Sequence, residues 1–211
     1  MQARSPNPSI LVDLDPASGD RTVIVESITA DRNGMLYLPD RVTGNILRVD
    51  PKSPKPIVVG RIEAREIKGK KVNADPSGIA FNAQGDLFVA VGPFAEVVRI
   101  RASEVNQGKP GVAQTFATGT SGANGLAFDR LGNLWVTANE RNALITVTPE
   151  GTVREVAKNG SQGPLEFPAA LVFVGDAAYI ANFDTPRRDN MDANGKTALD
   201  GTGASIARIT P

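Results

Sequence analysis

Carboxylate and carboxamide side chains recur immediately before and after short apolar stretches of this sequence. Those that precede such a stretch are Glu26, Asp75 and Asn124, and those that follow one are Asn139, Glu140, Asn182 and Asp184. Side chains of this kind are the ligands that hard cations such as Ca²⁺ and Mg²⁺ prefer, and a carboxylate can also act as a general base. The residue types therefore predict cation binding or hydrolysis, provided that the fold brings these positions together.

The composition excludes several other chemistries. Among its 211 residues the chain has no cysteine and no histidine, so a thiol nucleophile, a thiolate zinc site and a histidine base are all absent. Its 23 Lys and Arg residues balance its 23 Asp and Glu residues, whereas a phosphate-backbone binder needs a surplus of cations. We expect a small-molecule substrate or ligand, and neither a nucleic acid nor a membrane as partner.

An internal repeat organises the chain. The segment SGIAFNAQGDLFVA, residues 77–90, reappears as NGLAFDRLGNLWVT at residues 124–137, and weaker copies occupy residues 26–39 and 169–182. Each copy has a short apolar strand, a turn with glycine, and a second strand in which apolar and aromatic residues alternate. This order is typical of a β-hairpin.

Further strands follow each hairpin. Third strands with a period of two are expected at residues 45–51, 96–102, 143–149 and 204–211, and fourth strands at residues 56–62, 113–119 and 152–158. A repeat length in the forties with four strands per repeat is typical of a β-propeller blade. The sequence predicts an all-β protein, a single β-propeller domain over residues 1–211 with four-stranded antiparallel blades, about four of them visible.

An extra N-terminal strand pair precedes the first hairpin, at Ile10–Pro16 and Arg21–Ser27. Arg21–Ser27 could supply the fourth strand that the last blade lacks, which would leave Ile10–Pro16 over. Either part of a larger ring of the six-bladed type is missing from the chain, or the ring is small or open and a partner chain covers its edge. No signal peptide is expected in this sequence, and it is compatible with the cytoplasm, the periplasm or the extracellular space.

In a propeller, the innermost strands begin on the same face that carries the loops joining second and third strands. Glu26, Asp75, Ser77 and Asn124 stand at such strand starts, and Asn139, Glu140, Asn182 and Asp184 stand in or beside such loops. We therefore expect their side chains to converge at one end of the central channel, where oxygen atoms could surround a cation.

The hairpins GLAFDRLGNLWVTAN and GIAFNAQGDLFVA, with the opening VESITADRNGMLYLPDRVTGNILRVDP, resemble the senescence marker protein-30/gluconolactonase family and, more distantly, NHL-type propellers. The resemblance covers most of the chain from Glu26 onward. It implies hydrolysis of a small lactone or ester at a divalent cation, most simply Ca²⁺, with Mg²⁺ or Mn²⁺ as alternatives. Glu26 and Asn124, the latter in an Asn-Gly-Leu strand start, match two of the family's ligands, and blade four has Pro168-Ala169-Ala170 in place of a third.

The resulting hypothesis gives each candidate residue a role. The metal ligands would be Glu26, Asn124 and Asp184, the base would be one of Asp75, Glu140 and Asp184, and the substrate would contact Asn139, Asn182, Arg187 and Arg188. Cation polarisation of the carbonyl and a carboxylate-activated water would then hydrolyse the substrate. The alternatives are a non-catalytic NHL-like propeller that binds a protein or a small ligand, and an inactive remnant of a larger propeller.

The remaining features predict structure or a peripheral site. Asn190-x-Asp192-x-Asn194-Gly195, in the loop Asp184–Gly203, resembles the first half of a calcium loop. Trp135, Phe88, Tyr37 and Tyr179 occupy equivalent positions, so we expect them to pack between blades. The basic run at residues 61–71 is expected to be a solvated loop.

Overall fold

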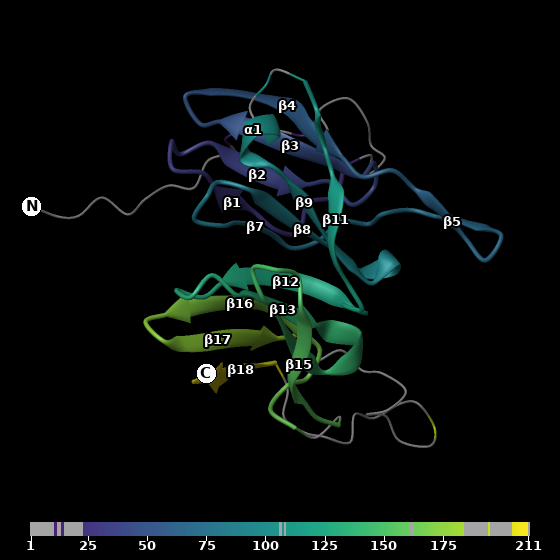
Figure 1. Cartoon of the computed structure of the whole chain (residues 1–211), viewed down its shortest axis with the longest axis vertical. Coiled ribbons are helices and arrows are strands. Elements are labelled where there is room, and N and C mark those ends of the chain that lie inside the picture. Colours follow the sequence, from purple (N-terminus) through teal and green to yellow (C-terminus); the bar gives the residue numbers. More distant parts are fainter. Residues whose placement is uncertain are drawn as a thin grey trace, which may run out of the picture.

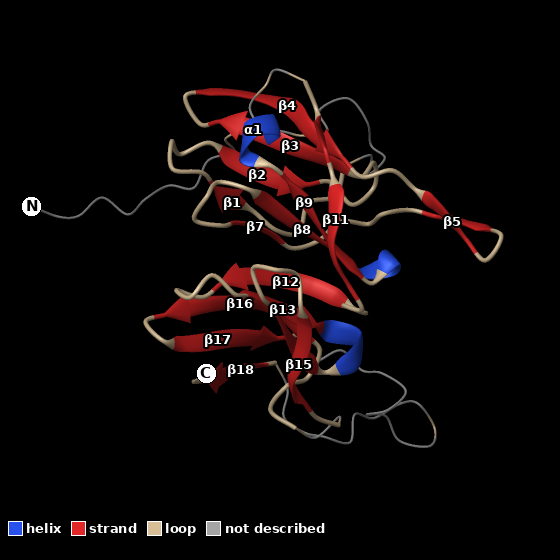
Figure 2. Cartoon of the chain, viewed as in Figure 1, coloured by secondary structure: helices blue, strands red, loops and turns tan. Residues whose placement is uncertain are grey.

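The computed structural model describes residues 23–105, 109–160, 163–183 and 204–210, with Leu11, Leu14, Gln107 and Asn194 as isolated residues. It is an all-β protein in which successive antiparallel sheets follow one another as the blades of a propeller (Figure 1). Among the described residues, helical structure is confined to short turns (Figure 2): α1 (Ala102–Val105) and two 3-10 turns at Gly92–Phe94 and Asn139–Arg141. No helix among these residues is long and apolar enough to cross a membrane.

The strands predicted from the sequence are present and form antiparallel sheets. Blade 1 contains β1 (Thr29–Ala30), β2 (Leu36–Pro39), β3 (Asn45–Asp50) and β4 (Ser53–Arg61), and blade 2 contains β7 (Ile79–Phe81), β8 (Leu87–Val91), β9 (Glu96–Ile100) and β11 (Gln114–Thr118). Blade 3 contains β12 (Ala123–Phe128), β13 (Leu134–Ala138), β14 (Ala143–Val147) and β15 (Val153–Lys158), and blade 4 contains β16 (Pro168–Val174), β17 (Ala177–Asn182) and β18 (Ser205–Ile209). A short strand, β10 (Gly111–Val112), pairs parallel to β4.

One turn chemistry closes the first three hairpins. Asp31, Asn82 and Asp129 each accept hydrogen bonds at Oδ1 from the backbone N–H groups two and four residues later, at 2.8 to 3.0 Å. The glycine three residues after each of them has a φ of +79° to +86°, a conformation that residues with a side chain rarely adopt. These turns fix the register of the hairpins and define one end of the channel, which we call the turn end.

Aromatic side chains fill the boundaries between blades, as predicted. Tyr37, Phe88 and Trp135 are at most 4% exposed, and each packs edge-on against a phenylalanine of the next blade's innermost strand. The ring centroids of Tyr37 and Phe81, Phe88 and Phe128, and Trp135 and Phe173 lie 4.9, 5.1 and 5.6 Å apart. Burial of rings this large makes these contacts a principal source of stability.

Blade 4 departs from that pattern on its outer face. Tyr179 is only half-buried, because no described sheet follows blade 4. On the same face Val172, Val174 and Ile206 are 57%, 65% and 76% exposed. The predicted packing of Tyr179 against a following blade is therefore not found within the described residues.

The N-terminal segment does not complete blade 4 where the structure describes it. Val25 instead forms a β-bridge with Asp40, at the end of β2 in blade 1. The backbone N–H of Arg41 donates to Ile24 O at 2.9 Å. Thus the described part of Arg21–Ser27 belongs to blade 1, and Ile10–Pro16 lies outside the described residues except for Leu11 and Leu14.

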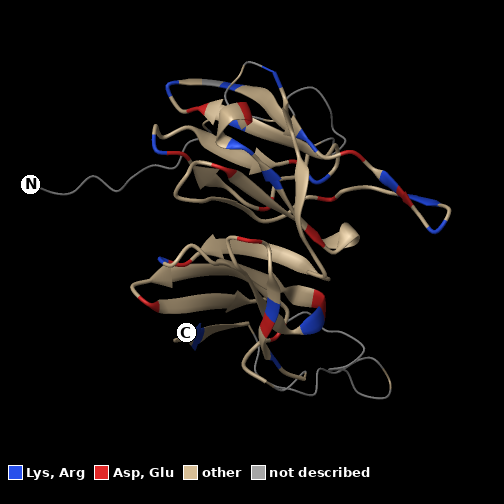
Figure 3. Cartoon of the chain, in the orientation of Figure 1, with Lys and Arg blue, Asp and Glu red and all other residues tan. Residues whose placement is uncertain are grey.

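Apart from the buried Ile62, the basic run at residues 61–71 is largely exposed, as expected, but most of it forms a hairpin rather than a loop. Strands β5 (Arg65–Ile67) and β6 (Lys70–Val72) pair across Lys68 and Gly69, which have φ values of +51° and +72°. Two such residues suit the tight turn of a two-residue hairpin. The hairpin projects from the blades and carries most of the charged side chains of this run (Figure 3).

Candidate functional site

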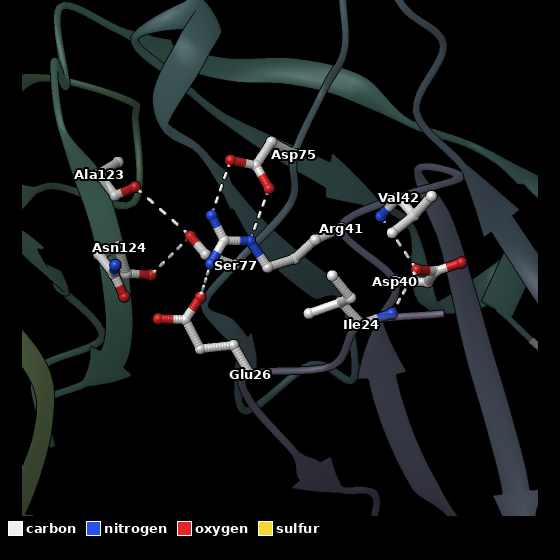
Figure 4. A network of polar contacts seen from close by, with 9 residues as sticks. All are labelled: Ile24, Glu26, Asp40, Arg41, Val42, Asp75, Ser77, Ala123 and Asn124. Atoms are coloured by element: carbon white, nitrogen blue, oxygen red, sulfur yellow. Dashed lines mark hydrogen bonds and ion pairs between the residues drawn. The ribbon is translucent and has the colours of Figure 1, made fainter. Parts of the chain in front are cut away.

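Arg41 joins two carboxylates at the end of the channel where the innermost strands begin, which we call the channel mouth (Figure 4). Its Nε and Nη2 atoms donate to Asp75 Oδ1 and Oδ2 at 2.6 and 2.8 Å, and Nη1 donates to Glu26 Oε2. A planar guanidinium that meets a carboxylate with two parallel bonds is geometrically specific. The pKa of Arg41 is raised, first by the hydrogen bonds that it donates to Asp75, so this side chain stays cationic.

Asp75 adopts an unusual backbone conformation that directs it to Arg41. Its φ is +45°, in the left-handed region, and it directly precedes Pro76. A residue other than glycine held there costs on the order of 1–3 kcal/mol and persists only where the surroundings enforce it. The ion pair with Arg41 is one interaction that compensates this strain.

The backbone of Arg41 is positioned by its neighbour Asp40, which is 1% exposed. Asp40 Oδ1 accepts from the N–H groups of Ile24 and Val42 at 3.2 and 3.0 Å, and Oδ2 accepts from the Thr43 hydroxyl. A buried carboxylate that accepts several hydrogen bonds stabilises a local turn. Asp40 is therefore structural, and its role is to hold the turn that presents Arg41.

A pocket of about 280 Å³ opens beside this ion pair. Its polar lining consists of Arg41, Asp75, Ser77, Asn124, Asn139 and Glu140. Ser77 is buried, and its hydroxyl donates to Asn124 O at 3.3 Å, which ties the innermost strands of blades 2 and 3 together. The prediction that strand starts and interstrand loops meet at one end of the channel is realised here for these residues.

The glycines of the Ser-Gly-Ile and Asn-Gly-Leu strand starts have a packing reason. A Cβ atom on Gly78 would lie 2.0 Å from Asn124 O, and one on Gly125 would lie 2.4 Å from Ala169 O. Neighbouring innermost strands therefore approach so closely that a side chain does not fit between them. This close approach accounts for the glycine in the motif that also suggested a metal ligand.

The described residues of the mouth form no carboxylate cage for a divalent cation. Glu26 and Asp75 are both ion-paired to Arg41, and the third carboxylate, Glu140, lies on the pocket wall. Across the described ranges, no group of three or more Asp or Glu side chains is arranged to hold a metal ion. Asp184, the third predicted ligand, lies outside the described residues.

Asn182 lies apart from the residues that line the pocket. Its Nδ2 donates to Pro164 O and Ser205 Oγ at 2.8 and 3.0 Å, and its Oδ1 accepts from the Glu166 N–H at 3.2 Å. Through these hydrogen bonds the Asn182 amide joins β17 to the segment before β16 and to the start of β18. Its contact with substrate stays a prediction, as do the roles of Arg187, Arg188 and the Asn190–Gly195 motif, which lie outside the described residues apart from Asn194.

The functional residue that sequence reasoning missed is Arg41. The sequence placed it in the loop after the second strand of blade 1 but gave it no role. The equivalent residues of blades 2, 3 and 4 are Gly92, Asn139 and Phe183. Arg41 is the one charged residue among these four equivalent positions, and Asp75 stands at the start of the next blade's innermost strand. This combination was the signal from which an ion pair at the mouth could have been predicted.

Comparison with known proteins identifies the fold and no family. A scan against known protein families finds no match, and a search of curated proteins finds none either. Among solved structures, virginiamycin B lyase from Staphylococcus aureus matches with a TM-score of 0.58 at 15% identity, over 91% of this chain and 54% of the lyase chain. A luciferin-regenerating enzyme matches with a TM-score of 0.65 at 15% identity, over 95% of this chain and 65% of that one.

A protein assigned as a gluconolactonase is also similar, with a TM-score of 0.59 at 18% identity, over 78% of this chain and 57% of the other. The neighbours are β-propellers, which agrees with the blades described above. The chain spans between 54% and 65% of the length of these three proteins. At such identities the likeness establishes the fold, while activity has to be argued from the site.

Proposed function

We propose that the channel mouth binds a small lactone or ester and hydrolyses it. The observation that carries this proposal is the Arg41–Asp75–Glu26 cluster beside a pocket of about 280 Å³ that is lined by further amide, hydroxyl and carboxylate groups. A concave site with a few convergent polar groups is the usual form of a small-molecule site. The gluconolactonase among the structural neighbours supports the choice of substrate class by analogy.

Arg41 would bind the carbonyl oxygen of the substrate. A guanidinium has five N–H groups, and three of them donate to Asp75 and Glu26, so two more can donate to a ligand. In a hydrolysis they would stabilise the negative charge that develops on the carbonyl oxygen. Both oxygens of Asp75 accept from Arg41, so Asp75 acts as a positioning residue rather than as the base.

Glu140 would activate the attacking water. It lies on the pocket wall next to Asn139 and is exposed. The water would lose a proton to the carboxylate and attack the carbonyl carbon, the acyl–oxygen bond would break, and the proton would pass to the leaving alkoxide. No step of this scheme is routed through a cation.

A non-catalytic ligand-binding role is the second candidate. It is favoured by the two hydrogen bonds from Arg41 to Asp75. Both carboxylate oxygens of Asp75, one of the predicted bases, are engaged in them. In that case the same pocket would bind a polar ligand without converting it.

Hydrolysis is tested with a panel of small lactones and 4-nitrophenyl esters, with acid release measured in a pH-stat. Glu140→Gln is expected to lower kcat by roughly 10²–10⁴-fold through loss of the base. Arg41→Gln is expected to lower it by about 10²–10³-fold through loss of a charge-stabilising donor. The control is Arg61→Gln, which removes an exposed ion pair with Glu63 away from the pocket and is expected to change nothing.

Each assay is repeated with EDTA and with added Ca²⁺, Mg²⁺ or Mn²⁺. Activity that survives EDTA agrees with the Arg41-based site, whereas activity that depends on an added cation supports the ligand set implied by the family resemblance. Saturable ligand binding without turnover, abolished by Arg41→Gln, would leave the non-catalytic role. Absence of both turnover and binding refutes both functions.

A further inference from the structure

A pocket lies at the turn end of each boundary between blades, and one of the three is much larger than the others. The pockets between blades 1 and 2 and between blades 3 and 4 measure about 240 and 220 Å³. The pocket between blades 2 and 3, which we call the turn-end pocket, measures about 620 Å³. Only this one has the size typical of sites for small organic ligands, roughly 300–1,000 Å³.

The difference between the boundaries begins with the aromatic residue on the second strand. At the outer boundaries, Tyr37 OH donates to Asp31 Oδ2 at 3.1 Å and Trp135 Nε1 donates to Asp129 Oδ2 at 3.0 Å, so each ring reaches its own hairpin turn. Phe88 is the equivalent residue of blade 2 and has no polar atom with which to reach Asn82. Phe88 therefore makes no contact of this kind beside the turn-end pocket.

Aromatic rings and two cations, Arg99 and Arg130, line this space. Phe88 packs edge-on against Phe116 and Phe128, with centroids 4.9 and 5.1 Å apart, and both of these partners are only half-buried. The guanidinium carbon of Arg99 lies 5.7 Å from the centroid of Phe116, and Nη1 of Arg99 lies 3.9 Å from Asp86 Oδ2. The latter distance is longer than that of a charge-assisted hydrogen bond, so Arg99 can donate to a ligand.

The carboxylates that line the pocket are already engaged. Asp86 Oδ1 accepts from the Ala102 N–H at 2.8 Å. Asp129 accepts from two backbone N–H groups and from the side chains of Asn133 and Trp135. Burial alone would raise the pKa of Asp129, but these hydrogen bonds outweigh it and lower the pKa. Both acids therefore have partners, and so does Arg130, whose Nη1 atom lies 2.8 Å from Asp176 Oδ1, which leaves Arg99 as the group best placed to bind an anion.

We propose that the turn-end pocket is a second ligand site that takes a small aromatic carboxylate. The ring of the ligand packs against Phe116 and Phe128, and its carboxylate accepts hydrogen bonds from Arg99. The site lies at the opposite end of the blades from the channel mouth and shares no lining residue with it. It is therefore independent of the hydrolytic function proposed above.

The test is calorimetric titration of the whole chain with 2-naphthoate and, as a neutral compound of matching shape, with naphthalene-2-carboxamide. The carboxamide and the variant Arg99→Gln are each expected to weaken binding by about tenfold, since each removes one charge-assisted interaction. Phe88→Trp is expected to weaken binding of both compounds, because the larger indole would take up space beside Phe116 and Phe128.

Arg48→Gln is the matched control. Arg48 lies opposite Tyr37 on β3 as Arg99 lies opposite Phe88 on β9. The Arg48→Gln substitution therefore removes the same charge from the equivalent position of another blade. The affinity of this variant for 2-naphthoate should equal that of the wild type. The proposal is overturned if the wild type shows no saturable binding, or if Arg99→Gln binds as the wild type does. It is equally overturned if a folded Phe88→Trp variant binds both compounds unchanged, or if Arg48→Gln weakens binding as much as Arg99→Gln.

Discussion

The turn end and the channel mouth are built from the same repeat, yet its equivalent positions behave differently at the two ends. At the turn end the first three blades reuse one solution: an Asp or Asn accepts from the turn backbone, and an aromatic ring packs on a phenylalanine of the next blade. At the mouth, equivalent positions hold Arg41, Gly92, Asn139 and Phe183. Positions that repeat between blades build the scaffold, and positions that differ build the site.

The exceptions sharpen this contrast. Phe88 departs from Tyr37 and Trp135 by lacking a polar atom, and the turn-end pocket of about 620 Å³ lies beside it. Gly78 and Gly125 are a repeated feature at the mouth, and they serve close packing of the innermost strands. Departure from the repeat therefore marks the two places where we propose ligand binding.

The largest effect is expected from a truncation at a repeated boundary position. Trp135→Ala removes a side chain that is 4% exposed, with its contact to Phe173 and its hydrogen bond to Asp129. It should lower the free energy of unfolding by about 3–5 kcal/mol, as measured by urea denaturation. Leu131→Ala, at a side chain that is 78% exposed, is the control and should change stability by no more than about 0.5 kcal/mol. Equal losses in both variants would contradict the assignment of Trp135 to the scaffold.

A smaller effect is expected where the repeat meets the mouth. Gly78→Ala places a Cβ atom 2.0 Å from Asn124 O, so the strands must move apart. Overpacking of this kind costs roughly 1–3 kcal/mol, and the displacement should also weaken ligand binding at the mouth. Gly160→Ala serves as the control, because nothing lies within 4 Å of its added Cβ. A Gly78→Ala variant as stable as the control would contradict the close approach of the innermost strands, because the added Cβ atom would then fit between them without a clash.

The smallest effect concerns one polar contact at the turn end. Trp135→Phe removes the donor to Asp129 and should cost about 1 kcal/mol at neutral pH. Because the folded state lowers the pKa of Asp129, this carboxylate stabilises the fold above its unfolded pKa and loses that contribution as the pH falls through the folded value. The stability difference between wild type and variant should therefore shrink below about pH 4, as followed by urea denaturation from pH 3 to 7. A difference that stays constant over this range contradicts the contact.

Much of the scaffold could be predicted from the sequence because its determinants are local. Alternation of apolar residues, the Asp or Asn turn residues and the glycines specify each hairpin within a few residues. The repeat then identifies equivalent aromatic positions, and the packing predicted for Tyr37, Phe88 and Trp135 is confirmed. The hairpin β5–β6 was expected as a loop, because its turn, Lys68–Gly69, is not one of the common turn pairs.

The sites depended on contacts between blades, which no local pattern encodes. The sequence placed Glu26, Asp75, Asn124 and Glu140 at the right end of the fold, because strand order alone decides at which end a strand starts. Only the tertiary structure decided that Arg41 of one blade lies between Glu26 and Asp75, and that Asn182 supports blade 4 rather than lining the pocket. Such pairings join residues far apart in the chain, and their distances follow from how closely neighbouring blades pack.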